Sequence, residues 1–262
     1  MKTLLIYEKL VSLHREAHRE LKLAPSEQKF AFARETNSVL IAAAELPLAA
    51  LDFPCVFIAT EGGHSLAALV GLRDHDNLFV QPDGAWVRGA YLPAFFRRYP
   101  FVLAEAEGSE EFTVCLDQAY PGLNTSSGEA LFDAAGRETP WLEEVKRFLV
   151  DFRQEMTASR VFADRLAALD LLQDGQIEYS LGGERATLRG FQTINEQKLR
   201  ALDASVQQEL FAKGWMGLIY AHLLSLNQVQ RLALRLDDQL NAAAPTTAAA
   251  AQVSAEGTSA LH

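Results

Sequence analysis

The first 123 residues consist of short apolar runs separated every few residues by turn signals. Residues 56–58 form one such run, which Gly62-Gly63 ends, and Asp83-Gly84 is another strong turn signal. Short runs between frequent turns are typical of strands that pair with their neighbours in sequence. They therefore predict a mostly antiparallel sheet, with further strands at 101–103 and 112–116. Alternating Phe30 and Phe32 extend the same prediction to KFAFA.

Helical periodicity replaces this pattern after an acidic connector that runs from Tyr120 to Glu138. Thr139 and Pro140 are residue types favoured at the N-cap and at the first position of a helix. Apolar residues then recur at helical spacing from Val145 to Leu169. We expect Asp174-Gly175 to end this helix.

A β-hairpin is predicted within the helical half. Ile177, Tyr179 and Leu181 alternate with polar residues, and Gly182-Gly183 can adopt the positive φ of a two-residue turn. After Asn195 the chain is helical again. The sequence thus predicts an α+β fold, with a mostly antiparallel sheet in the first half and helices plus one β-hairpin in the second half.

One domain and a tail are expected. Residues 1–240 are predicted to form a single domain, strand-rich over 1–123 and helix-rich over 139–240. Residues 241–262 are rich in Ala and Thr and have few large apolar side chains to repay the entropy of ordering. We expect them to be a disordered tail.

Charge and hydrophobicity restrict the class of protein. The 24 basic and 34 acidic residues give a net charge of −10, which argues against a nucleic-acid partner. Apolar stretches stay below the roughly 20 residues that cross a bilayer, and the first residues lack the pattern of a signal peptide. Cys55 and Cys115 lie in strand-like apolar runs, where a buried, reduced thiol is the usual state. A cytoplasmic protein is therefore expected.

Three histidines are candidates for a metal site. His14 and His18 are four residues apart, a spacing that puts two imidazoles on one helical face, and His75 lies between two aspartates. The sequence identifies no third ligand for the first pair, so surface histidines and an ordinary turn are the favoured interpretations. The alternative, a metal-dependent enzyme or subunit that uses these histidines to bind Fe or Zn, stays open. No cofactor is predicted, and the catalytic residues, if there are any, are unknown.

Aromatic and arginine side chains are most concentrated between Trp86 and Phe101. Five aromatic residues lie between Tyr91 and Phe101, and three arginines with no acidic residue among them lie between Arg88 and Arg98. Both residue types are enriched at binding hot spots. A core corner, whose arginines pair with the acidic stretch from Glu105 to Glu111, is the slightly favoured alternative. The candidate binding residues are Trp86, Arg88, Tyr91, Arg97, Arg98 and Tyr99.

The same segment also carries a family resemblance. It resembles the SapC family in NLFVxxDGxW from Asn77 to Trp86, YLPAFFRRYPF from Tyr91 to Phe101, and CLD from Cys115 to Asp117. Four further stretches are similar to the same family: ExPxxAxDFP (45–54), LxALDLL (166–172), LRGF (188–191) and LIYAHLLSL (218–226). The resemblance covers about Tyr7 to Arg235.

What the resemblance implies is an accessory role. The family is named after a bacterial protein associated with a surface layer, and it has no agreed catalytic residues. SapC-like genes are found beside halogenase-like, cupin-like and TonB-dependent-receptor genes. The leading hypothesis is a cytoplasmic accessory or binding protein of a surface-layer, TonB-dependent uptake or peptide-modification system. Its partner would be a halogenase-like, cupin-like or receptor-system protein. A structural surface-layer subunit is a further hypothesis, against which the missing signal peptide counts.

Overall fold

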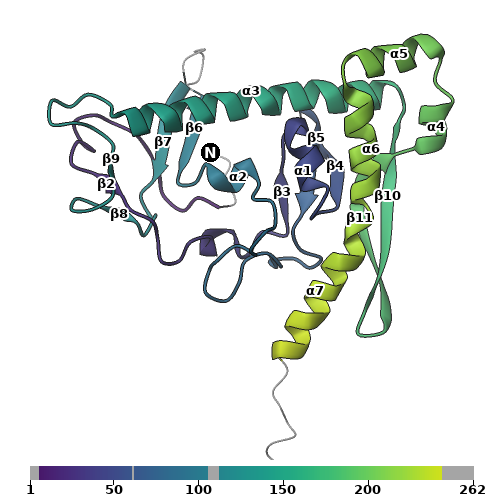
Figure 1. The fold of residues 1–262 in the computed structure, drawn as a ribbon, viewed down its shortest axis with the longest axis horizontal. Helices are drawn as coiled ribbons and strands as arrows, with labels where there is room; N and C mark the ends of the chain where they lie inside the picture. The colour runs from purple at the N-terminus through teal and green to yellow at the C-terminus, as the bar shows by residue number, and fades with distance from the viewer. Residues whose placement is uncertain (1–5, 61, 106–111, 244–262) are drawn as a thin grey trace, which may run out of the picture.

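The computed structural model describes residues 6–60, 62–105 and 112–243 (Figure 1). All the strand pairs in this part of the chain are antiparallel, so the prediction of an α+β fold with antiparallel sheets is confirmed. The largest sheet has the order β10-β11-β4-β5-β3, and two smaller sheets have the orders β1-β7-β6 and β8-β2-β9. The strands are β1 (Leu10–Ser12), β2 (Lys22–Leu23), β3 (Ser38–Leu40), β4 (Cys55–Thr60), β5 (Gly63–Leu69), β6 (Phe101–Glu105), β7 (Phe112–Asp117), β8 (Leu123–Asn124), β9 (Glu129–Ala130), β10 (Leu172–Leu181) and β11 (Glu184–Ile194).

Most of the helical residues come after β9 in the sequence. The 3₁₀ helices are η1 (Ala31–Ala33) and η2 (Ala43–Glu45). The α-helices are α1 (Leu46–Ala49), α2 (Ala94–Arg97), α3 (Pro140–Ala168), α4 (Glu196–Arg200), α5 (Ala204–Ala212), α6 (Trp215–Ser225) and α7 (Gln228–Ala243). The KFAFA strand prediction is wrong, because Ala31–Ala33 form η1 and the Phe32 ring stacks on Tyr99 at 3.9 Å between centroids.

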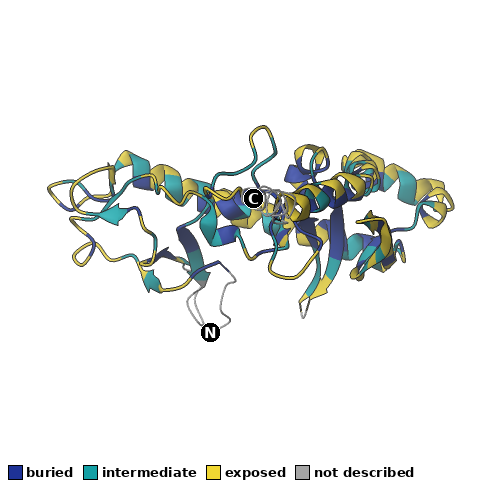
Figure 2. Cartoon of the chain, turned by 90° about the horizontal axis from the view of Figure 1, so that it is seen from below, coloured by how far each residue is buried: buried dark blue, intermediate teal, exposed yellow. Residues whose placement is uncertain are grey.

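The long helix α3 begins where the sequence predicts. The Thr139 side chain caps it by accepting a hydrogen bond from Leu142 N at 3.3 Å, and Pro140 occupies the first position. Figure 1 shows α3 running along the molecule from β6 and β7 to α6. Leu142 and Leu149 pack in a core cluster with the β7–β6 sheet, whereas Phe162 packs in the larger cluster with β4 and β5. Buried residues are frequent on the strands that pack against α3 (Figure 2), among them Cys55–Phe57 of β4 and Leu66–Leu69 of β5.

The predicted hairpin is present and longer than expected. Gly182 and Gly183 both have positive φ, 58° and 84°, and Leu181 pairs with Glu184 across the turn. Buried residues alternate with exposed ones along β10, and α7 packs against this strand. The expected helix end at Asp174-Gly175 is wrong, because α3 ends at Ala168 and both residues lie inside β10.

Helix α7 continues to Ala243 and so includes the first three residues of the expected tail, and residues 244–262 lie outside the described part of the chain. Cys55 and Cys115 are both buried free thiols, as expected. In the described ranges, no helix is long and apolar enough to cross a membrane.

Candidate functional site

Two carboxylates hold the start of the aromatic and arginine segment. The buried Glu45 side chain accepts hydrogen bonds from Ala94 N at 2.7 Å and from the Tyr91 hydroxyl at 2.9 Å. It also accepts one from Ala42 N at 2.8 Å, and Asp52 accepts one from Tyr91 N at 2.7 Å. Burial and the neighbouring Glu45 carboxylate raise the pKa of Tyr91 to about 12, so the phenol remains a donor at neutral pH. These bonds fix the position at which α2 begins.

Trp86 is half-buried and packs against the hydrophobic core beside this segment. Its indole Nε1 donates to Tyr91 O at 3.0 Å, and its ring stacks on Phe79 with the centroids 5.6 Å apart. Phe53 and Phe96 contact the same ring at 6.4 and 5.6 Å between centroids. Trp86 and Tyr91 therefore contribute to the core.

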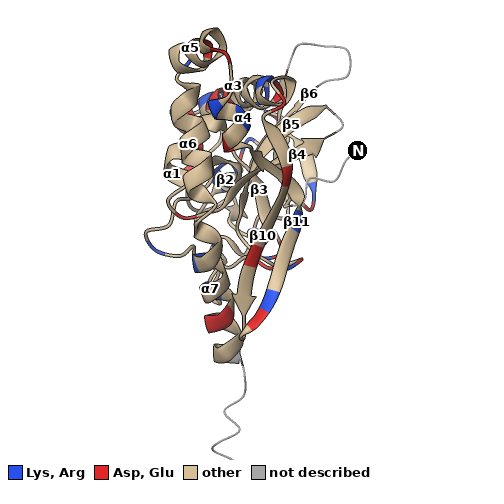
Figure 3. Cartoon of the chain, turned by 90° about the vertical axis from the view of Figure 1, so that its right-hand side faces the viewer, with Lys and Arg blue, Asp and Glu red and all other residues tan. Residues whose placement is uncertain are grey.

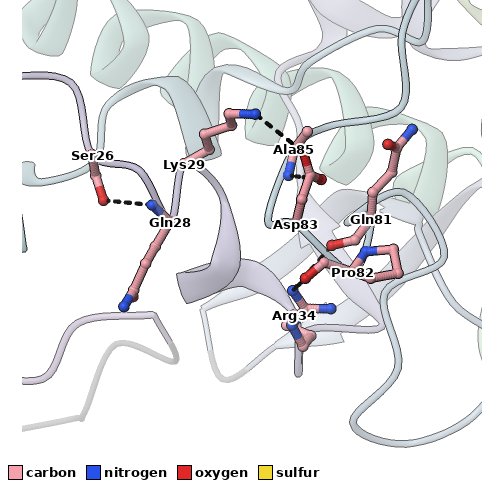
Figure 4. A network of polar contacts seen from close by, with 8 residues as sticks. All are labelled: Ser26, Gln28, Lys29, Arg34, Gln81, Pro82, Asp83 and Ala85. Atoms are coloured by element: carbon pink, nitrogen blue, oxygen red, sulfur yellow. Dashed lines mark hydrogen bonds and ion pairs between the residues drawn. The ribbon is translucent and has the colours of Figure 1, made fainter.

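The turn before Trp86 is attached to the chain around η1 (Figure 4). Lys29 Nζ pairs with Asp83 Oδ2 at 3.2 Å, and Arg34 Nη2 donates to Gln81 O at 3.0 Å. Gly84 has a φ of 77°, and a Cβ at this position would lie 2.3 Å from the main chain of residue 28. The turn signal found in the sequence thus marks a close main-chain approach.

Arg98 directly follows α2 and lies among aromatic rings. Its guanidinium carbon is 4.0 Å from the Phe95 ring centroid, 5.2 Å from that of Phe152 and 5.8 Å from that of Tyr7. Phe152 comes from α3, so helix packing places this ring beside the end of α2. Ring faces attract the cation, although more weakly than a carboxylate would.

The electrostatic environment of Arg98 is unfavourable for its charge. Burial lowers the pKa of Arg98, and Tyr7 acts in the opposite direction. Burial likewise raises the pKa of Tyr7 to about 12, opposed by Arg98. Among the described side chains no carboxylate forms an ion pair with Arg98, and its buried Nε has no hydrogen-bond acceptor. Removing a cation from water without a counterion costs free energy, which a carboxylate ligand would recover.

A cavity opens at this guanidinium. Its volume of about 240 Å³ is below the roughly 300–1,000 Å³ of ordinary small-molecule pockets, and suits one amino-acid side chain. Arg153, whose guanidinium carbon is 3.6 Å from the Phe112 ring centroid, lies on the same cavity. The cavity thus combines two cations with an apolar wall. Its lining residues are Arg98, Leu103, Phe112, Leu149, Phe152, Arg153 and Met156.

The remaining candidate binding residues lie in different surroundings. Arg97 is exposed beside Arg98, with its guanidinium carbon 5.4 Å from the Phe148 ring centroid, whereas the exposed Arg88 lies in the preceding turn. The Tyr99 hydroxyl donates to Asp117 at 3.4 Å. The structure therefore brings Arg97 and Arg98 together and places the tyrosines and Trp86 in packing roles. The alternative pairing with Glu105 to Glu111 involves side chains outside the described ranges.

The histidines do not converge. His18 is buried and its Nδ1 accepts a hydrogen bond from His14 N at 2.8 Å, so the prediction of two surface histidines is wrong for His18. Their segment forms turns and not a helix, because this hydrogen bond and those of the local main chain favour a compact loop. His75 lies in the predicted turn, with a φ of 57°. Within the described ranges, no group of three His, Cys, Asp or Glu side chains could hold a metal ion.

Comparison with known proteins gives one match, since a model of the SapC family matches residues 13–232. The chain belongs to the SapC family. No curated protein and no solved structure matches. Several SapC-like motif residues have architectural contacts in this chain, such as Glu45 and Asp52 above. Asp117 is also buried, and its carboxylate accepts hydrogen bonds from the main-chain nitrogens of Glu8 and Lys9 at 2.9 Å.

Sequence reasoning missed the part that α3 plays in this site. Phe152 lies in the apolar stripe predicted from Val145 to Leu169, and nothing in the spacing connects it with Arg98. Arg153 follows it directly, and this adjacent aromatic–arginine pair was the available signal. Glu45 also gave a signal, because an acidic residue within an apolar run requires hydrogen-bond donors when it is buried.

Proposed function

We propose that this SapC family protein is a non-catalytic binding protein that captures an acidic side chain or a C-terminal carboxylate of a protein partner in the Arg98 cavity. One observation carries the proposal: the guanidinium of Arg98 lies among three aromatic rings without a carboxylate partner among the described residues. A carboxylate pairs with a guanidinium through two parallel hydrogen bonds.

The apolar wall of the cavity defines the rest of the ligand. Leu149 and Met156 of α3 lie on the wall that Phe152 also forms, so the carbon atoms next to the carboxylate would be taken out of water. A planar arginine surrounded by aromatic rings is the composition of an interface hot spot. Arg97, exposed next to the cavity, would add long-range attraction to an acidic partner.

The family resemblance suggests which partner and compartment to test. The partner would be a halogenase-like, cupin-like or receptor-system protein, and the complex would form in the cytoplasm. It would serve a surface-layer, uptake or peptide-modification system. Cell fractionation followed by immunoblotting tests the compartment, and recovery of the chain outside the cytoplasm would contradict this part of the proposal.

Affinity capture from a lysate of the native cell tests the cavity. Arg98→Met retains an apolar side chain among the rings but removes the charge, whereas Arg88→Met removes an exposed charge away from the cavity. We expect a partner captured at equal stoichiometry by the wild-type protein and by Arg88→Met, and lost with Arg98→Met. A partner retained by Arg98→Met would contradict the proposal, provided that thermal melting shows all three proteins folded.

A separate experiment tests whether the chain's own acidic stretch occupies the cavity. Neutralising Glu107, Glu110 and Glu111 to Gln removes these charges without changing Arg98. We expect the triple variant to melt with the wild-type protein and to capture the same partner. The proposal would fail if the triple variant melted at a lower temperature than the wild-type protein and if the same three substitutions did not lower the melting temperature of Arg98→Met. That result would show that these acids occupy the cavity.

A further inference from the structure

The largest sheet is divided at its centre. Strands β4 and β11 are neighbours but share a single pair of opposed residues, Phe57 and Gln192. The later residues of β4, Ile58–Thr60, have ladder partners only on the β5 side. Residues 184–188 and Phe191 of β11 have theirs only on the β10 side. All of these residues are described, so two unpaired main-chain edges face each other beyond Gln192.

A β-bulge accounts for the divergence. Between the pairs formed by Gly175 and Ile177, β10 contributes Gln176 alone and β11 contributes Arg189 and Gly190. Gly190 has a φ of 90°, which favours glycine, and its missing Cβ would meet no atom within 4 Å. An extra residue bends the strand that carries it and increases its twist. The bulge therefore directs β11 away from β4.

A cleft with a volume of about 580 Å³ lies at this bulge. Ala59 is its lining residue from β4, and the other lining residues come from β10 (174–176) and from β11 (189–192), among them Gly190 and Gln192. The Gln192 Oε1 atom is buried and has no hydrogen-bond donor among the described residues. A buried amide oxygen without a donor is unfavourable, so an N–H group that enters the cleft would be stabilised there.

Charge does not define the occupant of this cleft. Asp174 and Arg189 both line it, so the two signs balance locally. Figure 3 shows the same mixture of acidic and basic residues along β10 and β11. Recognition therefore depends on hydrogen bonds to the main-chain edges.

We propose that an extended segment of a protein partner enters this cleft and adds as a strand to the outer edge of β11. A polypeptide main chain supplies N–H and C=O groups at the spacing of a strand, about 3.3 Å per residue, which is what both edges require. One of its amides donates to Gln192 Oε1. This second site is built from different elements than the Arg98 cavity, so it goes beyond the function proposed above.

Phage display of random eight-residue peptides on the full-length protein tests whether this cleft binds an extended peptide. Ala59→Trp fills the cleft from an exposed position, and Ser180→Trp places the same side chain at an exposed position of β10 that does not line it. Peptides enriched on wild type are synthesised with and without N-methylation at alternate residues, and affinity is measured by fluorescence anisotropy. We expect Ala59→Trp and N-methylation each to weaken binding about tenfold or more, and Ser180→Trp to change it less than about twofold.

Amide hydrogen exchange locates the bound peptide. We expect the exchange of residues 184–190 to slow when a selected peptide binds. The proposal is overturned if no peptide is enriched on wild type over Ala59→Trp, or if N-methylation has no effect. It is also overturned if these amides become protected in the free protein as its concentration rises, because the edge would then pair with a second copy of the chain.

Discussion

The buried imidazole of His222 should make the stability of the protein depend on pH. His222 on α6 is fully buried, its Nε2 accepts a hydrogen bond from Ile194 N at 3.1 Å, and its ring lies 5.0 Å from that of Phe57. Burial lowers its pKa from 6.5 to about 4, against an opposing contribution from the main chain of Cys55. Between pH 6.5 and about 4, His222 is therefore protonated in the unfolded chain but stays neutral in the folded protein.

The size of the effect follows from the difference in pKa. Full stability is present above pH 6.5 and is lost as the pH falls through the window from 6.5 to about 4. A difference of about 2.5 units at about 1.4 kcal/mol per unit gives about 3 kcal/mol in the free energy of unfolding. His222→Gln keeps an acceptor for Ile194 N but does not titrate. We expect this variant to lose about 1 kcal/mol at pH 7 and to lack the His222 part of the acid dependence.

Urea unfolding of both proteins at half-unit steps from pH 7.5 to 4 provides the measurement. The difference in unfolding free energy between variant and wild type cancels the titration of the other groups, provided that unfolding is two-state. That difference should shift by about 3 kcal/mol in favour of the variant across the window. Parallel pH profiles would refute the reasoning, as would an NMR titration of His222 in the folded protein with an unshifted midpoint.

Three further outcomes are expected. Glu45→Ala removes the acceptor of three hydrogen bonds and should lower the free energy of unfolding by about 3 kcal/mol in urea; a loss below about 1 kcal/mol would contradict the anchoring role. Gly84→Ala, which meets the Gln28 carbonyl, should destabilise by about 2 kcal/mol or more, and Gly182→Ala, which meets open space, by about 1 kcal/mol; equal losses would contradict the close approach. Burial raises the pKa of Cys55 to about 12, so a thiol reagent should label it only on unfolding, and rapid labelling of the native protein would contradict this burial.

Local signals predicted the elements that depend on neighbouring residues. The hairpin at Gly182-Gly183 was predictable because its turn and its alternation lie within one short stretch, and Thr139-Pro140 marked the start of α3 for the same reason. KFAFA has the same alternation as a strand, yet Phe32 faces Tyr99, which is distant in sequence. Tertiary packing decided that segment, and periodicity alone could not.

The candidate site was predictable in composition but not in arrangement. The aromatic and arginine pattern singled out Arg98, whereas Phe152 reaches it only because α3 packs beside α2. The half-buried position of Trp86 depends on contacts with Phe53 and Phe79, which come from two other segments. The bulge at Gly190 could not be predicted, because a single glycine in a strand indicates a tight bend or a close main-chain approach as readily as a bulge.

Helix α3 makes the two cores interdependent. Its first half supplies Leu142 and Leu149 to one cluster and its second half supplies Phe162 and Leu166 to the other, over 29 residues or about 43 Å of continuous helix. A break at its middle would leave each half too short to be stable alone and would expose apolar surface at both ends of the molecule. The helix therefore belongs to both hydrophobic clusters. Separating the strand-rich and helix-rich halves of the chain would expose apolar side chains of both clusters to water.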